Sequence, residues 1–316
     1  MTPEPPLGLR ERFGLRPLRP ALRQARLVFQ GDAYTRPSRF DTTSLAILRP
    51  RWSLPLWAGR RIAGRRAPIY NFFNHLQPDP DFGWSVRKTH VRDFRGGADT
   101  YDSHNGTDFA VPVGTLVVAA APGVVLRVSN EFHRGGIKVL IDHGHGVVTT
   151  SNHLARALVA PGDHVARAAP VGWSGASGID VITMFPWSTP HLHYNTWLDG
   201  VPVDPFALSE TPLWRDGNRP LPHAGPLDTV FESSRYDEAR VEQALAACLH
   251  AESRAEIESE PTLERRAGAV MFHQNYYPLR FRSHTSPYGA PHARTGLLTL
   301  PLAARDFDGV AYPEEV

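Results

Sequence analysis

Cysteine is nearly absent from this chain of 316 residues, because Cys248 is the only one. A scaffold held together by internal disulfides is therefore excluded. The sequence also contains no run of about 18 apolar residues, so we expect no membrane-spanning helix. Lysine occurs only as Lys88 and Lys138, and the net charge is only +2. A balance this small gives no indication of nucleic-acid binding.

Turn-forming residues are plentiful instead. Proline (29) and glycine (26) together make up about a sixth of the chain, above the usual ~12%. Such a composition favours many turns and disfavours an all-helical bundle. The hydrophobic and charged fractions, 41% and 21%, are ordinary for a globular protein, and the length fits one large or two modest domains.

Charge divides the chain into three parts. Residues 1–66 contain fourteen arginines against four acids, a net charge of +10, whereas residues 67–206 and 207–316 carry −3 and −5. The first part shows neither strand nor helix periodicity. We therefore expect it to be a basic Arg/Pro-rich arm that is extended or partly ordered.

The first thirty residues do not have the pattern of a secretory leader, which needs about 7–15 apolar residues after a short basic segment. Arginines are instead spread through the whole stretch, from Arg10 to Arg26. Arginine enrichment with few acids is also a feature of transit peptides, but a solvated basic arm is the favoured interpretation. The compartment of the protein is left open by this pattern.

The middle part, residues 67–206, has the pattern of a mainly β domain. Short β-rich runs alternate with turn signals at Pro122-Gly123, Pro161-Gly162 and Asp199-Gly200. The expected strands cover residues 115–120, 123–128, 137–142, 146–153, 171–175 and 191–198. Short strands separated by frequent turns favour an antiparallel β-sandwich or barrel.

The last part, residues 207–316, is expected to be a partly helical extension. Residues 234–237 resemble a capping box, and apolar residues then recur at helical spacing over residues 241–249. A second helix is expected to begin at Pro261 and to run to about Ala269. Cys248 lies on the apolar stripe, which favours a small core residue over a nucleophile.

Eight of the fifteen histidines lie between His104 and His193. His104 and Asp108 are four residues apart, and an imidazole and a carboxylate are both good zinc ligands. His191 and His193 are two apart on an expected strand, so both rings face the same side. His153 lies at the end of another strand. Taken singly, each pattern is also typical of ordinary hydrogen-bonded side chains.

In their order along the chain, these clusters and the turns between them resemble the lysostaphin/LytM-type zinc metallopeptidases, which cleave peptide cross-links in bacterial cell walls. The resemblance covers about a third of the chain. The matching segments are His104-Asn-Gly-Thr-Asp108, Gly114-Thr-Leu-Val-Val-Ala, Gly123-Val-Val, Val139-Leu-Ile-Asp-His-Gly, Asn152-His-Leu, Pro161-Gly-Asp-His-Val, Val171-Gly-Trp-Ser-Gly, Pro190-His-Leu-His and Gly200-Val-Pro-Val-Asp-Pro205. The resemblance implies a small β-sandwich with a groove over one sheet.

By this resemblance, His104, Asp108 and His193 are the three protein ligands of one zinc ion, which leaves a fourth position for water. The metal lowers the pKa of that water towards ~7. His153 and His191 correspond to the two catalytic histidines of the family: one moves the proton, and the other donates to the oxyanion. We favour His191 as the base, although sequence does not distinguish the two. The other histidines of this window are expected to be structural or exposed: His133, His143, His145 and His164.

The sequence departs from the family pattern at three places, and no role is assigned to the change at Asn195. Ser151 stands where the family usually has tyrosine, and Asn195 replaces a common acidic residue. The segment between Gly178 and Pro190 is longer than usual and contains Phe185 and Trp187. Two interpretations of this segment stay open: a substrate-contacting rim beside the metal, or a hydrophobic plug packed against the C-terminal part.

The resemblance implies a zinc-dependent metalloendopeptidase that hydrolyses peptide bonds in peptidoglycan cross-links or stem peptides. The presence of all three ligands and both catalytic histidines favours this over a non-catalytic LytM-like regulator or binding module of cell-wall hydrolases. A peptidase with a substrate outside the wall is a third possibility. The cleaved bond and the oligomeric state are not given by sequence. We expect deletion of residues 1–66 to leave zinc binding intact, and their charge to attract anionic wall polymers or membrane surfaces.

Overall fold

The computed structural model describes residues 6–74, 87, 92–97, 104–182 and 184–316. The strands are β1 (Arg66–Asn71), β2 (Thr107–Ala110), β3 (Leu116–Val118), β4 (Gly123–Glu131), β5 (Gly136–Asp142), β6 (Val147–Ala157), β7 (His164–Val165), β8 (Pro170–Ser174), β9 (His191–Leu198), β10 (Val201–Pro202) and β11 (Gly309–Ala311). The α-helices are α1 (Leu9–Arg12), α2 (Leu18–Gln30), α3 (Pro50–Trp57), α4 (Ile179–Ile182), α5 (Glu238–Ala247), α6 (Ala251–Glu258) and α7 (Leu263–Tyr276). Short 3₁₀ turns are η1 (Thr42–Ile47), η3 (Pro278–Arg280) and η4 (Pro313–Glu315).

All of these strands belong to one mixed sheet of 11 strands, in the order β11-β1-β2-β9-β6-β5-β4-β7. Strand β10 pairs with β9, and β8 joins β3 to β6. The pair β1–β11 is parallel, and the other strand pairs among the described residues are antiparallel. The expected mainly β core is present, although strand pairing by itself does not divide it into the two sheets of a sandwich.

The six strands expected in the middle part are all found, as β3, β4, β5, β6, β8 and β9. Their ends follow the expected turns, and Gly162 and Gly200 have positive φ angles that residues with a side chain rarely adopt. Strands β1 and β11 were not expected. Strand β11 pairs with β1 across more than two hundred residues of sequence, and local patterning carries no signal for such a pairing.

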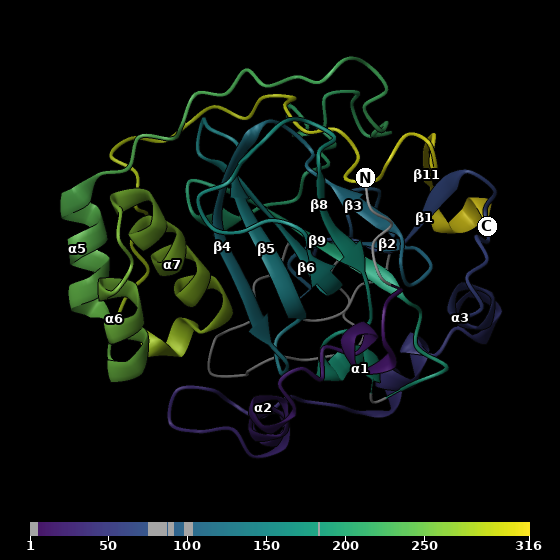
Figure 1. Cartoon of the computed structure of the whole chain (residues 1–316), viewed down its shortest axis with the longest axis horizontal. Helices are drawn as coiled ribbons and strands as arrows, with labels where there is room; N and C mark the ends of the chain where they lie inside the picture. Colours follow the sequence, from purple (N-terminus) through teal and green to yellow (C-terminus); the bar gives the residue numbers. More distant parts are fainter. Residues whose placement is uncertain (1–5, 75–86, 88–91, 98–103, 183) are drawn as a thin grey trace.

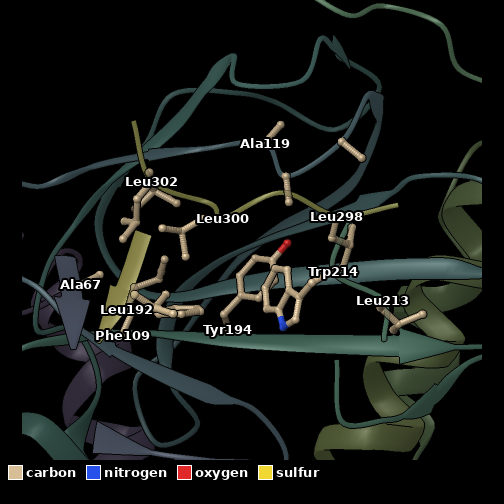
Figure 2. Close-up of a cluster of buried hydrophobic side chains, with 14 of the residues drawn as sticks. Ala67, Phe109, Ala119, Leu192, Tyr194, Leu213, Trp214, Leu298, Leu300 and Leu302 are labelled. Carbon is tan, nitrogen blue, oxygen red and sulfur yellow. The ribbon is translucent and has the colours of Figure 1, made fainter. Parts of the chain in front are cut away.

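The principal core lies on one face of the sheet and draws on two of the three parts of the chain. Phe109 and Leu192, from neighbouring strands β2 and β9, pack in one cluster with Trp214, Leu298 and Leu300 (Figure 2). The last three residues belong to the C-terminal part, so its irregular segments complete the core of the sheet. Burial of such large side chains contributes about 1.5–3 kcal/mol each.

Helices α5, α6 and α7 lie together beside the sheet (Figure 1). Helix α7 packs Phe272 and Tyr276 against Leu126 and Trp197 of the strands. It runs on to Tyr276, beyond the expected end near residue 269, because its last two turns are buried against the sheet.

The start of α5 and the segment after it differ in detail from the expected pattern. The N-cap of α5 is Asp237 rather than Ser234, since the Asp237 carboxylate accepts the backbone N–H of Arg240. Cys248 is buried in a cluster with Val270, as expected of a core residue. Helix α6, capped by His250, was not expected as a separate element.

Residues 1–66 were expected to be extended or partly ordered, and their described part contains the three helices α1, α2 and α3. Ala21 and Val28 lie seven residues apart on one face of α2 and pack against Phe132 and Ile179. Only one narrow face of the helix is buried, so few residues carry the apolar spacing. The frequent arginine and proline residues around them obscure it in the sequence. Tertiary packing, rather than composition, decides the structure here.

The N-terminal region is also tied to the sheet by polar contacts. Glu11 accepts from Arg156 of β6 at 2.6 and 3.0 Å, and the pair is partly buried. The carbonyl of Arg12 accepts the backbone N–H of Ala176, which follows β8. In contrast to the expectation from sequence, deletion of residues 1–66 is therefore expected to disturb the sheet as well. None of the described helices has the length and apolar character needed to cross a membrane.

Acid sensitivity of the fold is expected from His143. Its ring is buried and hydrogen-bonds the Pro122 carbonyl and Thr149, and burial lowers the pKa of His143 from 6.5 to about 4. Between these two values the unfolded chain binds one proton more than the folded chain. The contribution is therefore fully present above pH 6.5 and is lost as the pH falls, by about 1.4 kcal/mol per pH unit.

Denaturant unfolding at several pH values will test this. The His143→Gln variant should lose that part of the slope, whatever its absolute stability. The His145→Gln variant, changed at an exposed neighbouring ring, is the matched control and should keep the slope of the parent. An unchanged slope in His143→Gln would show that His143 is protonated in the folded state too.

Candidate metal centre

Three neighbouring strands bring the candidate residues together. In the antiparallel pairing of β2 with β9, Asp108 lies opposite His193. In the pairing of β9 with β6, His193 lies opposite Asn152, the residue before His153. Side chains alternate along a strand, so His191 and His193 share one face of β9 while Leu192 faces the core.

The His104, Asp108 and His193 side chains converge on one point. The Asp108 carboxylate lies between the two rings: Oδ2 is 2.9 Å from His104 Nε2, and Oδ1 is 2.7 Å from His193 Nδ1. Their three ligand atoms all lie within 4.8 Å of one another, as do one atom each of His153, His191 and His193. His193 is therefore shared by two groups, and the five residues form one continuous cluster.

Backbone carbonyls orient three of the four rings. The Nδ1 atoms of His104, His153 and His191 lie 2.6, 2.7 and 2.8 Å from the carbonyl oxygens of Phe72, Ser177 and Thr189, respectively. A carbonyl can only accept, so Nδ1 carries the proton in each neutral ring. The opposite nitrogen, Nε2, then has a free lone pair. A carbonyl partner of this kind is a usual support for a metal-binding histidine.

The surroundings of the buried Nε2 atom of His104 indicate whether these residues fit a metal ion. It makes no hydrogen bond of good geometry, although it is close to Asp108. A buried polar atom without a partner is costly unless a ligand satisfies it. Two imidazole nitrogens and one carboxylate oxygen are also a donor set that suits a divalent transition metal with an open position. The residues therefore fit a metal ion.

Charge at the cluster is set by competing influences. Burial, the largest of them, favours the neutral acid of Asp108, but His104 and His191 and two hydrogen bonds together hold the pKa of its carboxyl well below the usual value. Burial is also the largest influence on His193 and lowers the pKa of its ring. Burial also favours a neutral His104, but Asp108 outweighs it and raises the pKa of that ring, so His104 must release its proton when a metal ion binds.

The backbone at His153 is in an unusual conformation. Its φ angle is +58°, a left-handed value that bulky residues adopt rarely and at a cost of about 1–3 kcal/mol. Its N–H donates to the Gly135 carbonyl, and its own carbonyl accepts from Gly175, so both neighbours hold it in place. The effect is to aim the ring at His191, with ring centroids 4.7 Å apart.

Position 106, inside the His104–Asp108 segment, accepts only glycine. A Cβ atom at this position would lie 2.8 Å from His193 Nε2 and 2.9 Å from Asn195 Nδ2. Contacts this short do not occur without displacement, so only glycine lets the segment cross this closely over β9. The close crossing places His104 and Asp108 beside His193.

Sequence reasoning assigned no role to Asn195, which lies at the centre of a buried hydrogen-bond network. Its Nδ2 donates to the backbone and side-chain oxygens of Asn105 and lies 3.0 Å from His193 Nε2. Its Oδ1 accepts from Asn152 Nδ2 at 2.8 Å and from the hydroxyl of Tyr276 in α7 at 3.0 Å. Through Asn195, the C-terminal helix is connected to a proposed metal ligand.

Tyr70 is a second residue that sequence reasoning missed. Its hydroxyl lies 3.2 Å from His191 Nδ1, and the two rings pack edge to face. It belongs to β1, outside the motifs that carry the family resemblance, so no local signal pointed to it. Ser151, where the family usually has tyrosine, is buried and pairs with Tyr194 of β9.

The other histidines of this window have different surroundings. His143 is buried and hydrogen-bonded within the fold, whereas His145 and His164 are exposed. Burial, the largest influence, and nearby cations lower the pKa of His133 to about 2. The expectation that these four are structural or exposed agrees with their positions.

The segment between residues 178 and 190 packs on the N-terminal region rather than on the C-terminal part. The Phe185 ring contacts Phe13 and Trp57, at centroid distances of 5.5 and 4.8 Å. Of the two interpretations left open by sequence, these contacts give no support to a plug against residues 207–316. Phe185 and Trp187 remain about half exposed, at 51% and 47%, so the segment also presents apolar surface.

Comparison with known proteins identifies the domain that carries this cluster. Peptidase family M23 matches residues 102–205, a span that includes all five residues of the cluster. The peptidoglycan DD-endopeptidase ShyA of Vibrio cholerae is 40% identical over 101 residues, which are 32% of this chain and 22% of that protein. The DD-carboxypeptidase/endopeptidase Mpg of Neisseria meningitidis is 34% identical over 110 residues, 35% of this chain and 24% of that protein.

The match to peptidase family M23 covers residues 102–205, about a third of this chain, and describes that part only. It spans less than a quarter of the length of the curated relatives named above. Among solved structures, a zinc-containing peptidase from Vibrio cholerae is 28% identical and covers 46% of this chain and 39% of that chain. Its TM-score is 0.33, an overlap too loose to place individual residues.

The close approach at Gly106 gives a direct test of the geometry. The Gly106→Ala variant should bind zinc, used here as the probe ion, at least tenfold more weakly, because the new methyl group displaces His193. Competition with a chelating dye measures the affinity. The control is Gly8→Ala, where a Cβ meets nothing within 4 Å. Equal affinity of both variants would mean that the crossing at Gly106 does not position the ligands.

Proposed function

We propose that this chain is a zinc-dependent metalloendopeptidase that hydrolyses peptide bonds in peptidoglycan cross-links or stem peptides. The observation that carries the proposal is the continuous cluster in which His193 is shared between a ligand group and a pair of further histidines. The proposal of peptidoglycan as the substrate is supported by the similarity to ShyA, a peptidoglycan DD-endopeptidase, over 101 residues. We further propose that residues 67–206 form a sandwich-like catalytic unit.

In this proposal His104, Asp108 and His193 hold one zinc ion per chain. When bound, zinc would supply Lewis acidity that activates a water molecule and polarises a peptide carbonyl. The proposed ligands are supported by the buried Nε2 of His104 and by the ionised Asp108 beside it. A zinc ion held by a single carboxylate and two neutral rings would keep a net positive charge for the oxyanion to meet.

His191 is proposed as the general base. Its Nδ1 proton is directed to the Thr189 carbonyl, so the lone pair of Nε2 is free to accept a proton. That Nε2 lies 3.6 Å from Asp108 Oδ1, on the same side as the proposed metal ligands. The proton that His191 takes from water is then available for the amine that leaves.

His153 is proposed to stabilise the oxyanion. Its Nδ1 proton is directed to Ser177, so Nε2 can donate a hydrogen bond only after the ring has become an imidazolium. His153 therefore acts in its protonated form and His191 in its neutral form. Two groups needed in opposite states give a bell-shaped dependence of kcat/KM on pH.

Variants that lose zinc binding and variants that lose only hydrolysis test these roles. His193→Ala should lose zinc, while His191→Ala and His153→Asn should retain zinc and lower kcat about 10²–10⁴-fold. Asparagine is chosen at position 153 because it tolerates the left-handed backbone. Metal analysis gives the zinc content, and mass spectrometry of digested peptidoglycan gives the released peptides. His164→Ala, changed at an exposed ring, is the control.

The outcomes distinguish the proposal from its alternatives. Zinc binding without any released peptide would favour a non-catalytic binding module or a substrate outside the wall. A full zinc complement in His193→Ala would remove that residue from the ligand set. Turnover close to that of the parent in His191→Ala would assign the base elsewhere.

A further inference from the structure

Helix α2 presents a row of apolar side chains to solvent. Leu18, Leu22 and Phe29 are 44%, 61% and 64% exposed. They are spaced by four and seven residues, so they follow one another along a single face of the helix. The helix lies at the outer edge of the molecule, away from the sheet core (Figure 1).

The orientation of this helix is set by the face next to this row. Ala21 and Val28 are buried against Phe132 and Ile179. Rotation that would bury the outer row would expose these contacts. The apolar row is therefore a permanent feature of the surface and not the inner face of a loosely attached helix.

Arginines run beside the apolar row. Arg19, Arg23 and Arg26 are exposed, and α2 contains no acidic residue. Arg19 and Arg23 form no ion pair or hydrogen bond within the described part of the chain, and Arg26 donates to Gln30, a neutral partner. Their charge is therefore available to an external anion.

We propose that α2 is a docking surface for an anionic lipid bilayer. Apolar side chains on one strip and arginines along its border are the pattern of a helix that lies in the plane of a membrane interface. The leucine and phenylalanine side chains would enter the acyl boundary, and the guanidinium groups would remain at the phosphates. The charge of the region, +10 over residues 1–66, complements such a surface.

The apolar row favours a bilayer over a soluble anionic polymer. A polyanion would use the arginines and leave Leu22 and Phe29 in water, whereas a bilayer takes up both kinds of side chain. Docking through α2 would hold the peptidase domain next to the membrane. The proposal rests on the helix surface alone and goes beyond the proposed hydrolysis.

Co-sedimentation of the full chain with vesicles tests the proposal. The chain should bind vesicles of phosphatidylcholine with phosphatidylglycerol at least about tenfold more tightly than vesicles of phosphatidylcholine alone. Leu22→Ser/Phe29→Ser and Arg19→Gln/Arg23→Gln should each weaken binding about tenfold or more. Circular dichroism and thermal unfolding establish that both double variants are folded.

Two matched controls carry the same chemical changes elsewhere. Leu208→Ser/Leu227→Ser alters leucines that are 85% and 72% exposed, and Arg235→Gln/Arg305→Gln removes two exposed charges. Both should bind as the parent does. Absence of binding to anionic vesicles, or equal binding to both vesicle types, would overturn the proposal. A loss confined to the arginine variant, with equal loss of binding to soluble polyphosphate, would replace it with a polyanion site.

Discussion

The register of three adjacent antiparallel strands is the constraint on which the site depends. A slip of one residue in β9 would turn His191 and His193 into the core and Leu192 towards the cluster. Burial of Leu192 against Phe109 opposes that slip, so the apolar pattern of the core sets the position of the polar cluster. Close crossing at Gly106 and carbonyl partners for the rings then complete the arrangement.

The segments that flank the family domain take part in this architecture. Trp214 and Leu300 complete the core beneath β2 and β9, and Tyr276 of α7 binds the amide of Asn195 beside His193. On the opposite flank, Tyr70 of β1 contacts His191. The domain shared with the relatives is thus surrounded by contacts from both sides of the sequence, and its fold and site are coupled to them.

Sequence reasoning succeeded where the signal was local and periodic. The strands of the middle part follow from alternation and turn signals, and the grouping of His104, Asp108 and His193 follows from the family resemblance. It failed for α2, because only Ala21 and Val28 of this helix are buried, while other apolar residues and three arginines face solvent. The contact of Tyr276 with Asn195 was also inaccessible, since it joins residues 81 positions apart and depends on how α7 packs.

The two ends of the strand path are short, with two residues in β7 and three in β11. Unpaired strand edges usually offer backbone N–H and C=O groups to any extended chain that approaches. The terminal strands themselves have room for only one or two such hydrogen bonds, but β7 pairs with only Gly123 and Val124 of β4. An extended peptide therefore gains little by pairing with β7 or β11, whereas the edge of β4 beyond Val124 has no strand partner on that side among the described residues.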